Sequence, residues 1–199
     1  LTTVLVGVAL AAAAFFGYRA LVVQPHEQEA MNQIWKAQLY FENDSLDAAV
    51  NGDGLYPGFQ EIADNYDGTK AGMLANYYMG IINRDNVEYE AALENFKKVD
   101  FSDNAVGILA MGNVGDMYVE LEQYEEGAKW LTKAATEARS SASEEFSAPF
   151  YLYKAATVNY ELGNYPMAYK QFNSIVEDYP KSSEHDKAIK WAGRLDQYK

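Results

Sequence analysis

The chain has 199 residues, enough for one domain or a short array of helical repeats and too few for two large catalytic domains. It contains no cysteine and only two histidines, which excludes disulfides, thiol nucleophiles and most structural zinc sites. The formal net charge of −13 at pH 7 gives a surface that repels nucleic acid and anionic lipid headgroups.

The first part of the chain is apolar. Residues 1–18 contain no charged side chain, and the stretch from Val4 to Val23 is long enough, as a helix, to cross a bilayer core about 30 Å thick. Arg19 lies beside Tyr18 near the end of this stretch, where both side chains reach the membrane interface. We therefore expect a transmembrane anchor over residues 1–24. A cleaved signal peptide is the alternative. The apolar region of such a peptide is shorter and ends at small residues, and residues 9–14 are rich in Ala.

Two further features bear on this expected anchor. The flank that follows it, residues 24–29, contains no Lys or Arg, which is typical of the non-cytoplasmic side of a membrane and predicts an N-terminus inside and a C-terminal domain outside. Small residues along the stretch form a face that could dock another membrane helix. The residues assigned to the anchor are Gly7, Ala11, Ala14 and Arg19.

The rest of the chain has the periodicity of helices. Beyond Pro25 the apolar residues recur every three or four positions, and no segment alternates with period two. Breakers such as residues 51–54 and 67–68 divide this part into short helices. The sequence predicts an all-α fold, with a linker or first helix at 25–45, an array of helix pairs at 46–181 and a capping helix at 182–199.

The expected capping helix has one apolar stripe, formed by Ala188, Ile189, Ala192 and Leu195. Trp191 lies one helical step away from this stripe. It either packs sideways or meets a partner, and the sequence leaves both alternatives open.

One pattern recurs three times in the predicted array. A tyrosine begins a helix, a small residue follows three positions later, and a large apolar residue lies four positions beyond it. The three copies begin at Tyr89, Tyr124 and Tyr165, which we expect to pack in the core, and a weaker, shortened copy covers residues 54–66. In the helices that precede these three, small residues lie at matching positions: Gly80, Gly115 and Ala156.

These residues resemble the tetratricopeptide repeat. The match is best at residues 162–165, with Ala168, Phe172 and Pro180 following, whereas Gly127 replaces the alanine of the second helix. The resemblance implies a solenoid of stacked helix hairpins after the anchor. Because this fold serves many functions, it says little about what the chain does.

The layout of one span followed by repeats, with residues 35–38, 40–42, 51–54 and 67–71, resembles envelope proteins of bacteria of the Bacteroides and Flavobacterium kind. It is similar to the single-pass tetratricopeptide subunit that accompanies the bacterial Sec translocon. In that family the repeats face the periplasm, and the protein pairs with a membrane-anchored prolyl-isomerase-like chaperone.

The resemblance implies a bacterial inner-membrane protein with a periplasmic C-terminal domain and an accessory role in protein export. The implied partners are translocon subunits, that chaperone and the membrane through one helix, with no nucleic acid and no small-molecule substrate. The alternative is a scaffold or assembly subunit of another cell-envelope or secretion complex.

No pattern in the sequence predicts catalysis. The Asn, Asp and Gly residues at 51–54 lack the alternating ligands and closing Glu of an EF-hand, so we interpret them as a tight turn. An enzyme acting on glycans through paired carboxylates would need a pocket motif that the sequence does not show. We expect no enzyme activity, no cofactor and no metal site.

By resemblance to tetratricopeptide grooves, a binding face is lined by the first helix of each pair. Here it would form an acidic, tyrosine-bearing trough that holds an extended or helical segment of a basic partner. A merely solvated concave surface is the alternative. The predicted groove residues are Tyr77, Ile81, Arg84, Asp116, Glu120, Tyr153, Thr157, Tyr160 and Glu161.

Overall fold

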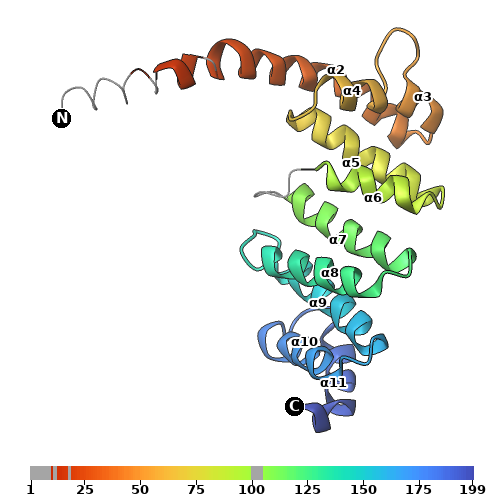
Figure 1. The fold of residues 1–199 in the computed structure, drawn as a ribbon, viewed down its shortest axis with the longest axis vertical. Coiled ribbons are helices and arrows are strands. Elements are labelled where there is room, and N and C mark those ends of the chain that lie inside the picture. The colour runs from red at the N-terminus through yellow and green to blue at the C-terminus, as the bar shows by residue number, and fades with distance from the viewer. Residues whose placement is uncertain (1–9, 11–12, 18, 100–104) are drawn as a thin grey trace. The chain divides into compact units, whose positions relative to one another are not determined.

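The structure is a computed structural model that describes residues 10, 13–17, 19–99 and 105–199. In this part of the chain every regular element is a helix, so the predicted all-α fold is confirmed (Figure 1). The elements are the π-helix η1 (Arg19–Val23), α2 (Gln24–Glu42), α3 (Leu46–Asn51), α4 (Phe59–Asn65), α5 (Lys70–Asp85), α6 (Tyr89–Lys97), α7 (Ala105–Glu120), α8 (Tyr124–Ala138), α9 (Glu144–Glu161), α10 (Tyr165–Asp178), α11 (His185–Arg194) and the 3-10 helix η2 (Asp196–Tyr198).

The predicted transmembrane anchor, and the single-pass inner-membrane location derived from it, are wrong. Across the described residues, no helix is both long enough and apolar enough to cross a membrane. Helix α2 follows η1 without a break at Gln24 and carries Glu27 and Glu29 in its early turns, so the helical segment becomes polar where the apolar stretch ends.

The residues assigned to the anchor have different places. Gly7 and Ala11 lie outside the described residues, as do all of 1–9, 12 and 18. Ala14 is exposed in a short helical segment, and Arg19 is exposed in η1.

The described helices pack as two units, residues 1–79 and 80–199, and helix α5 has residues in both. In the first unit α2 packs against α3 and α4, and Ile34 and Phe59 are almost fully buried. The ring of Tyr78 stacks on Phe59 with centroids 4.8 Å apart. At the start of α5 the backbone N–H of Lys70 donates to the Glu27 carboxylate at 3.0 Å, which satisfies a donor at the helix N-terminus.

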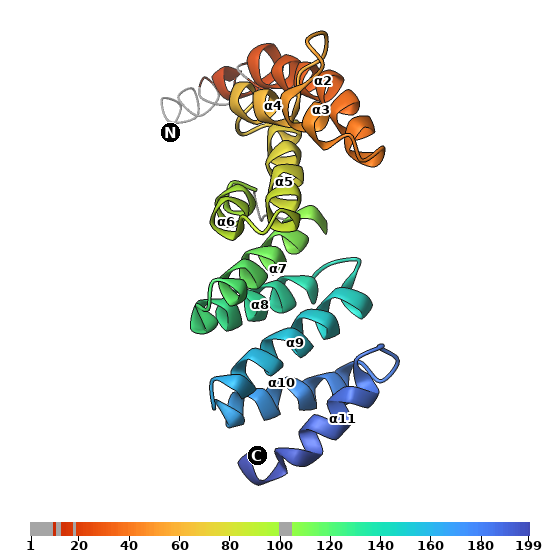
Figure 2. The ribbon, with the colours of Figure 1, turned by 90° about the vertical axis from the view of Figure 1, so that its right-hand side faces the viewer.

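In the second unit each helix from α6 to α11 contacts the next one along the chain (Figure 2). Two of the hairpins are packed closely at a glycine. A Cβ atom added at Gly80 would lie 2.6 Å from the ring of Phe96, and one added at Gly115 would lie 2.7 Å from Cγ of Leu131. Both pairs have the same sequence separation, so matching positions in the sequence make matching contacts. Ala156, at the third matching position, is fully buried.

A residue with a left-handed backbone ends the first helix of each hairpin. Val87, Glu122 and Gly163 have φ of 66°, 59° and 73°. In each turn the next N–H donates to the carbonyl oxygen five residues earlier, at 2.8 Å, which caps the helix. Asp44, between α2 and α3, has φ of 56° and the same bond at 2.9 Å. The turn therefore recurs between α2 and α3 rather than in residues 54–66, where the sequence analysis places a shortened copy.

The core differs from the sequence analysis at several side chains. Tyr124 is 40% exposed, whereas Tyr89 and Tyr165 are half-buried. On α11, Ile189 is 46% exposed although Ala188 on the same expected stripe is fully buried. Sequence spacing identified the helix starts at these tyrosines, but not how much of each ring the neighbouring helix covers.

The close approach at Gly115 makes a testable prediction. Replacing Gly115 by Ala places the new methyl group against the branch point of Leu131, which costs about 1–3 kcal/mol and outweighs the gain in helix propensity of roughly 1 kcal/mol. Urea unfolding is expected to show a net loss of stability. The control is Gly193→Ala on α11, where nothing lies within 4 Å of the added atom, and this variant is expected to be unchanged or slightly stabilised. Equal behaviour of the two variants would contradict the close packing.

Candidate functional site

The first helices α5, α7 and α9 are joined by polar side chains on one face of the second unit. Lys154 Nζ on α9 lies 2.5 Å from both carboxylate oxygens of Asp116 on α7. Arg84 on α5 donates from Nη1 to Asn113 Oδ1 on α7 at 3.1 Å. These contacts hold charged groups from three helices side by side.

The carboxylate at the centre of this face, that of Asp116, is partly removed from water, which disfavours its charged form. Burial raises the pKa of Asp116, and the Lys154 ammonium and Arg84 guanidinium oppose that rise without cancelling it. Glu120, one helical turn further along α7, adds to the rise by charge repulsion. Because the desolvation of Asp116 is only partly offset, an additional positive group placed here would be stabilised.

The same residues line an open depression of about 370 Å³. Its carboxylates are Asp85, Asp116 and Glu120, and its cations are Arg84 and Lys154. The Glu120 carboxylate accepts a hydrogen bond from the hydroxyl of Tyr89, and Arg84 also pairs with Asp85 at 2.8 Å. The depression is therefore charged, with an excess of acidic groups.

Beside the depression lie large apolar side chains in solvent. Phe146 and Phe150, four residues apart on α9, are 82% and 46% exposed, and Leu109 on α7 is 41% exposed. Side chains four residues apart lie on the same side of a helix, so Phe150 lies beside Lys154, whose ammonium is 5.2 Å from its ring centroid. We call this surface the first-helix face; it comprises Arg84, Leu109, Asn113, Asp116, Phe146, Phe150 and Lys154.

The structure brings only some of the predicted groove residues together. Arg84, Asp116 and Glu120 line the depression. Tyr77 and Ile81 are half-buried on α5. The remaining predicted residues, on α9, are Tyr153, Thr157, Tyr160 and Glu161.

The two tyrosines of α9 are covered by the last helix. Trp191 of α11 donates from Nε1 to the Tyr153 hydroxyl at 3.2 Å, and its ring centroid lies 4.7 Å from that of Tyr160. The same indole stacks on Phe172 at 5.7 Å with an interplanar angle of 8°. Trp191 therefore packs inward, which decides between the two alternatives of the sequence analysis. Thr157 donates its hydroxyl to the backbone oxygen of Tyr153, and Glu161 is exposed.

Sequence reasoning missed the exposed side chains of the first-helix face. The sequence did contain a signal for them. A segment predicted to be helical carries Phe146, Phe150 and Lys154 at four-residue spacing. Leu109 and Asn113 have the same spacing on α7. What the sequence could not show is that α8 and α10 leave this side of the first helices uncovered.

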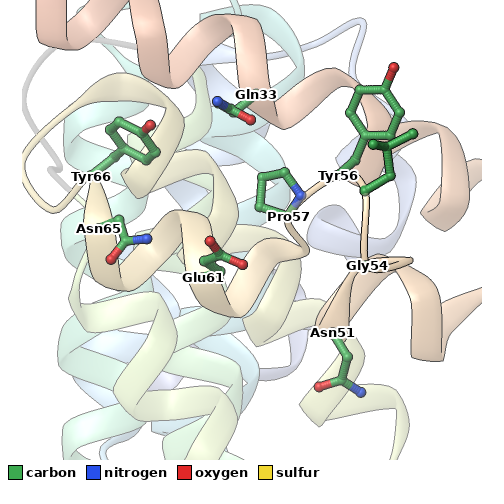
Figure 3. A pocket seen from close by; sticks show the side chains of 9 residues that line it. Gln33, Asn51, Gly54, Tyr56, Pro57, Glu61, Asn65 and Tyr66 are labelled. Atoms are coloured by element: carbon green, nitrogen blue, oxygen red, sulfur yellow. The ribbon is translucent and has the colours of Figure 1, made fainter.

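A second depression, of about 330 Å³, lies in the first unit between α2, α4 and the loop that joins α3 to α4 (Figure 3). Figure 3 shows Gln33 on the α2 side and Glu61 and Asn65 on the α4 side, with Pro57 of the loop between them. The lining residues are Gln33, Asn51, Gly54, Leu55, Tyr56, Pro57, Glu61, Asn65 and Tyr66.

The loop beside this depression is organised by Asp53. Its carboxylate accepts hydrogen bonds from the Tyr40 hydroxyl at 2.6 Å and from the backbone N–H groups of Leu55 and Tyr56 at 2.9 and 2.7 Å. These hydrogen bonds lower the pKa of Asp53 to about 2, and the bond from Tyr40 has the largest effect. Gly52 has φ of 80°, in agreement with the tight turn expected here.

No group of three or more His, Asp or Glu side chains that could hold a metal ion occurs within the residues that the structure describes. No protein-family model matches the chain, and no curated protein is similar to it in sequence.

The hydrogen bond of Tyr40 makes a testable prediction for the loop. In Tyr40→Phe, the pKa of Asp53 is expected to rise from about 2 towards its ordinary value of 3.8, because the largest stabilisation of the carboxylate is lost. Since a lowered folded-state pKa contributes stability above the unfolded value, the wild type loses this contribution as the pH falls from about 4 to 2, and the variant loses less.

Carbon-detected NMR titration of the Asp53 carboxyl group measures this shift. Tyr89→Phe, which removes a different tyrosine–carboxylate bond, is the control and should leave the pKa of Asp53 unchanged. An Asp53 pKa that is the same in Tyr40→Phe and in the wild type would show that the phenol does not hold the carboxylate.

Proposed function

We propose that this chain is a non-enzymatic protein-interaction module that binds a basic, partly apolar segment of a partner protein on its first-helix face. One observation carries the proposal: exposed Phe150 lies against Lys154 of the partly buried Asp116–Lys154 pair, with the ammonium 5.2 Å from its ring centroid. Exposed Phe146 lies one turn before Phe150 on α9, and exposed Leu109 lies two turns before Asp116 on α7. Apolar anchors next to desolvated charge are the composition of binding hot spots.

The apolar part supplies affinity. Removing a fully exposed Leu or Phe side chain from water is worth about 1.5–3 kcal/mol. Phe146 is 82% exposed, whereas Phe150 and Leu109 are less than half exposed, so covering the latter two gives a partner less than half of that value each. Phe146 and Phe150 are four residues apart, and a segment lying across α9 would contact both rings at once. This arrangement suits an extended or helical peptide rather than a small molecule.

The charged part supplies selectivity. Burial raises the pKa of Asp116 even with Lys154 beside it, and Asp85 and Glu120 add negative charge to the same depression. A Lys or Arg from a partner would offset the remaining cost of burying Asp116, whereas an acidic residue would add to it. We therefore expect basic segments to be preferred.

The depression lacks the arrangement that acid–base catalysis requires. Asp116 is held by Lys154, and Glu120 accepts a hydrogen bond from Tyr89, so neither carboxylate is poised against an open substrate site. Binding rather than chemistry is the function that these side chains support.

For the partner itself, we propose the classes implied by the resemblance of the chain's layout, without its membrane span, to the translocon-associated subunit. These are subunits of the Sec translocon and a prolyl-isomerase-like chaperone, in an accessory role in protein export. The support for this choice is the repeat pattern together with the acidic character of the depression, which matches the basic segments proposed as ligands.

The proposal is tested by selecting random twelve-residue peptides on the full chain. Enriched peptides are expected to combine Leu or aromatic residues with Lys or Arg. In fluorescence polarisation, Phe150→Ala and Asp116→Asn should each weaken the binding of these peptides about tenfold, the loss expected for one hot-spot side chain.

The matched control is Ile189→Ala. Ile189 on α11 has the same exposure of 46% as Phe150 but lies outside the first-helix face, so its truncation should leave the affinity unchanged. Enrichment of acidic peptides, or equal losses in Phe150→Ala and Ile189→Ala, would overturn the proposal.

A further inference from the structure

We propose that Asp67 is a site of spontaneous covalent modification, at which the folded chain forms isoaspartate and becomes a substrate for a carboxyl methyltransferase that recognises this product. The site lies in the turn between α4 and α5 of the first unit, outside the two depressions described above and outside the first-helix face. Its function would be separate from the binding of a partner segment.

The reaction needs only the side chain of an Asp and the backbone nitrogen that follows it. The nitrogen of Gly68 attacks Cγ of the protonated Asp67 carboxyl group, an N–Cγ bond forms, and one water molecule leaves. Water then adds to the main-chain carbonyl carbon of Asp67 in the resulting ring, and the bond from this carbon to the Gly68 nitrogen breaks. The product contains the same atoms, but its main chain runs through Cγ. Glycine favours ring closure, because no side chain hinders its nitrogen.

The fold restrains one of the dipeptides in which Gly follows Asn or Asp. The sequence contains three of them: Asn51-Gly52, Asp53-Gly54 and Asp67-Gly68. Asn51 ends α3, its amide donates to Asp47 at 2.9 Å, and the N–H of Gly52 donates to the Ala48 oxygen at 2.9 Å. The backbone of Gly52 also packs against Tyr56, whose oxygen would lie 2.4 Å from an added Cβ atom. Ring closure at Asn51 would have to break these contacts.

The other two dipeptides form a matched pair that differs at the carboxylate. Gly54 and Gly68 have φ of 83° and 75°, and nothing lies within 4 Å of a Cβ atom added at either. The Asp53 carboxylate, however, accepts the three hydrogen bonds described above, which lower its pKa to about 2 and keep it deprotonated. It cannot release an oxygen as water until it is protonated and leaves these donors.

Asp67 has no such restraint. Its side chain is exposed and forms no hydrogen bond or ion pair with any residue that the structure describes. The base of the turn is fixed instead by Thr69, whose N–H and hydroxyl both donate to the Tyr66 oxygen, at 3.1 and 2.7 Å. Within the described chain, neither the Asp67 carboxylate nor the N–H of Gly68 makes a hydrogen bond that has to break before the ring closes.

The modification would act on the start of α5. Isoaspartate adds one carbon atom to the main chain between Tyr66 and Thr69, whereas the hydrogen bonds across this turn fit its present length. The Thr69 hydroxyl also accepts the N–H of Gly72, in the first turn of α5, at 3.0 Å. We expect this cap to weaken, so that the amide hydrogen of Gly72 exchanges faster in the modified chain.

The test is incubation of the full chain at physiological temperature and mildly acidic pH. Methylation by an isoaspartyl methyltransferase and mass spectrometry with electron-transfer fragmentation then locate the product. Isoaspartate is expected to form at least about tenfold faster at residue 67 than at residue 53, because one pKa unit already changes the protonated fraction tenfold. In the chain unfolded with guanidinium chloride the two residues should react at similar rates, since the fold no longer distinguishes them.

Two variants complete the test. Asp67→Glu keeps the charge but would have to close a larger ring, so methylation located at residue 67 should be lost. Tyr40→Phe removes one donor to Asp53 and should raise isoaspartate at residue 53 without changing that at residue 67. Equal rates at residues 53 and 67 in the folded chain, a preference for residue 67 that persists in the unfolded chain, methylation at residue 67 that persists in Asp67→Glu, or unchanged exchange at Gly72 would each overturn the inference.

Discussion

The second unit depends on the close approach of the two helices in a hairpin at a glycine. At Gly80 and Gly115 the absence of a side chain lets Phe96 and Leu131 reach the backbone of the first helix. A third glycine, Gly112, lets the ring of Tyr151 on α9 approach α7, the two helices on which Asp116 meets Lys154. The first-helix face is thus a consequence of packing on the other sides of the same helices.

Much of the fold could be predicted from local sequence, and the errors have physical causes. The tyrosines at 89, 124 and 165 begin helices as expected, because the repeat spacing encodes where hairpins turn. The membrane span was inferred from apolar length alone, and the described helices do not contain it. Val87 and Glu122 adopt left-handed turns without glycine although both are exposed, so the hydrogen bonds that cap the helix in each turn offset the cost of a side chain there.

The candidate sites were harder to predict, because they depend on which neighbour covers which residue. Arg84, Asp116 and Glu120 were identified from repeat positions and do line one depression. Tyr153 and Tyr160 were identified from repeat positions in the same way, yet Trp191 of α11 covers them. The depression near Glu61 combines residues from α2, a loop and α4, and no local spacing links those three segments. The excess of carboxylates around Asp116 is the basis for the proposed preference for basic segments, in keeping with the strongly acidic composition.

The most direct measurement of the central claim is the set of intermolecular nuclear Overhauser effects between the chain and a peptide that it selects. The account predicts contacts from the peptide to the ring of Phe150 and the methyl groups of Leu109, which lie on α9 and α7 of the first-helix face. Contacts confined to Ile189 on α11 or Met167 on α10, which are also exposed, would contradict it and would place the binding surface elsewhere.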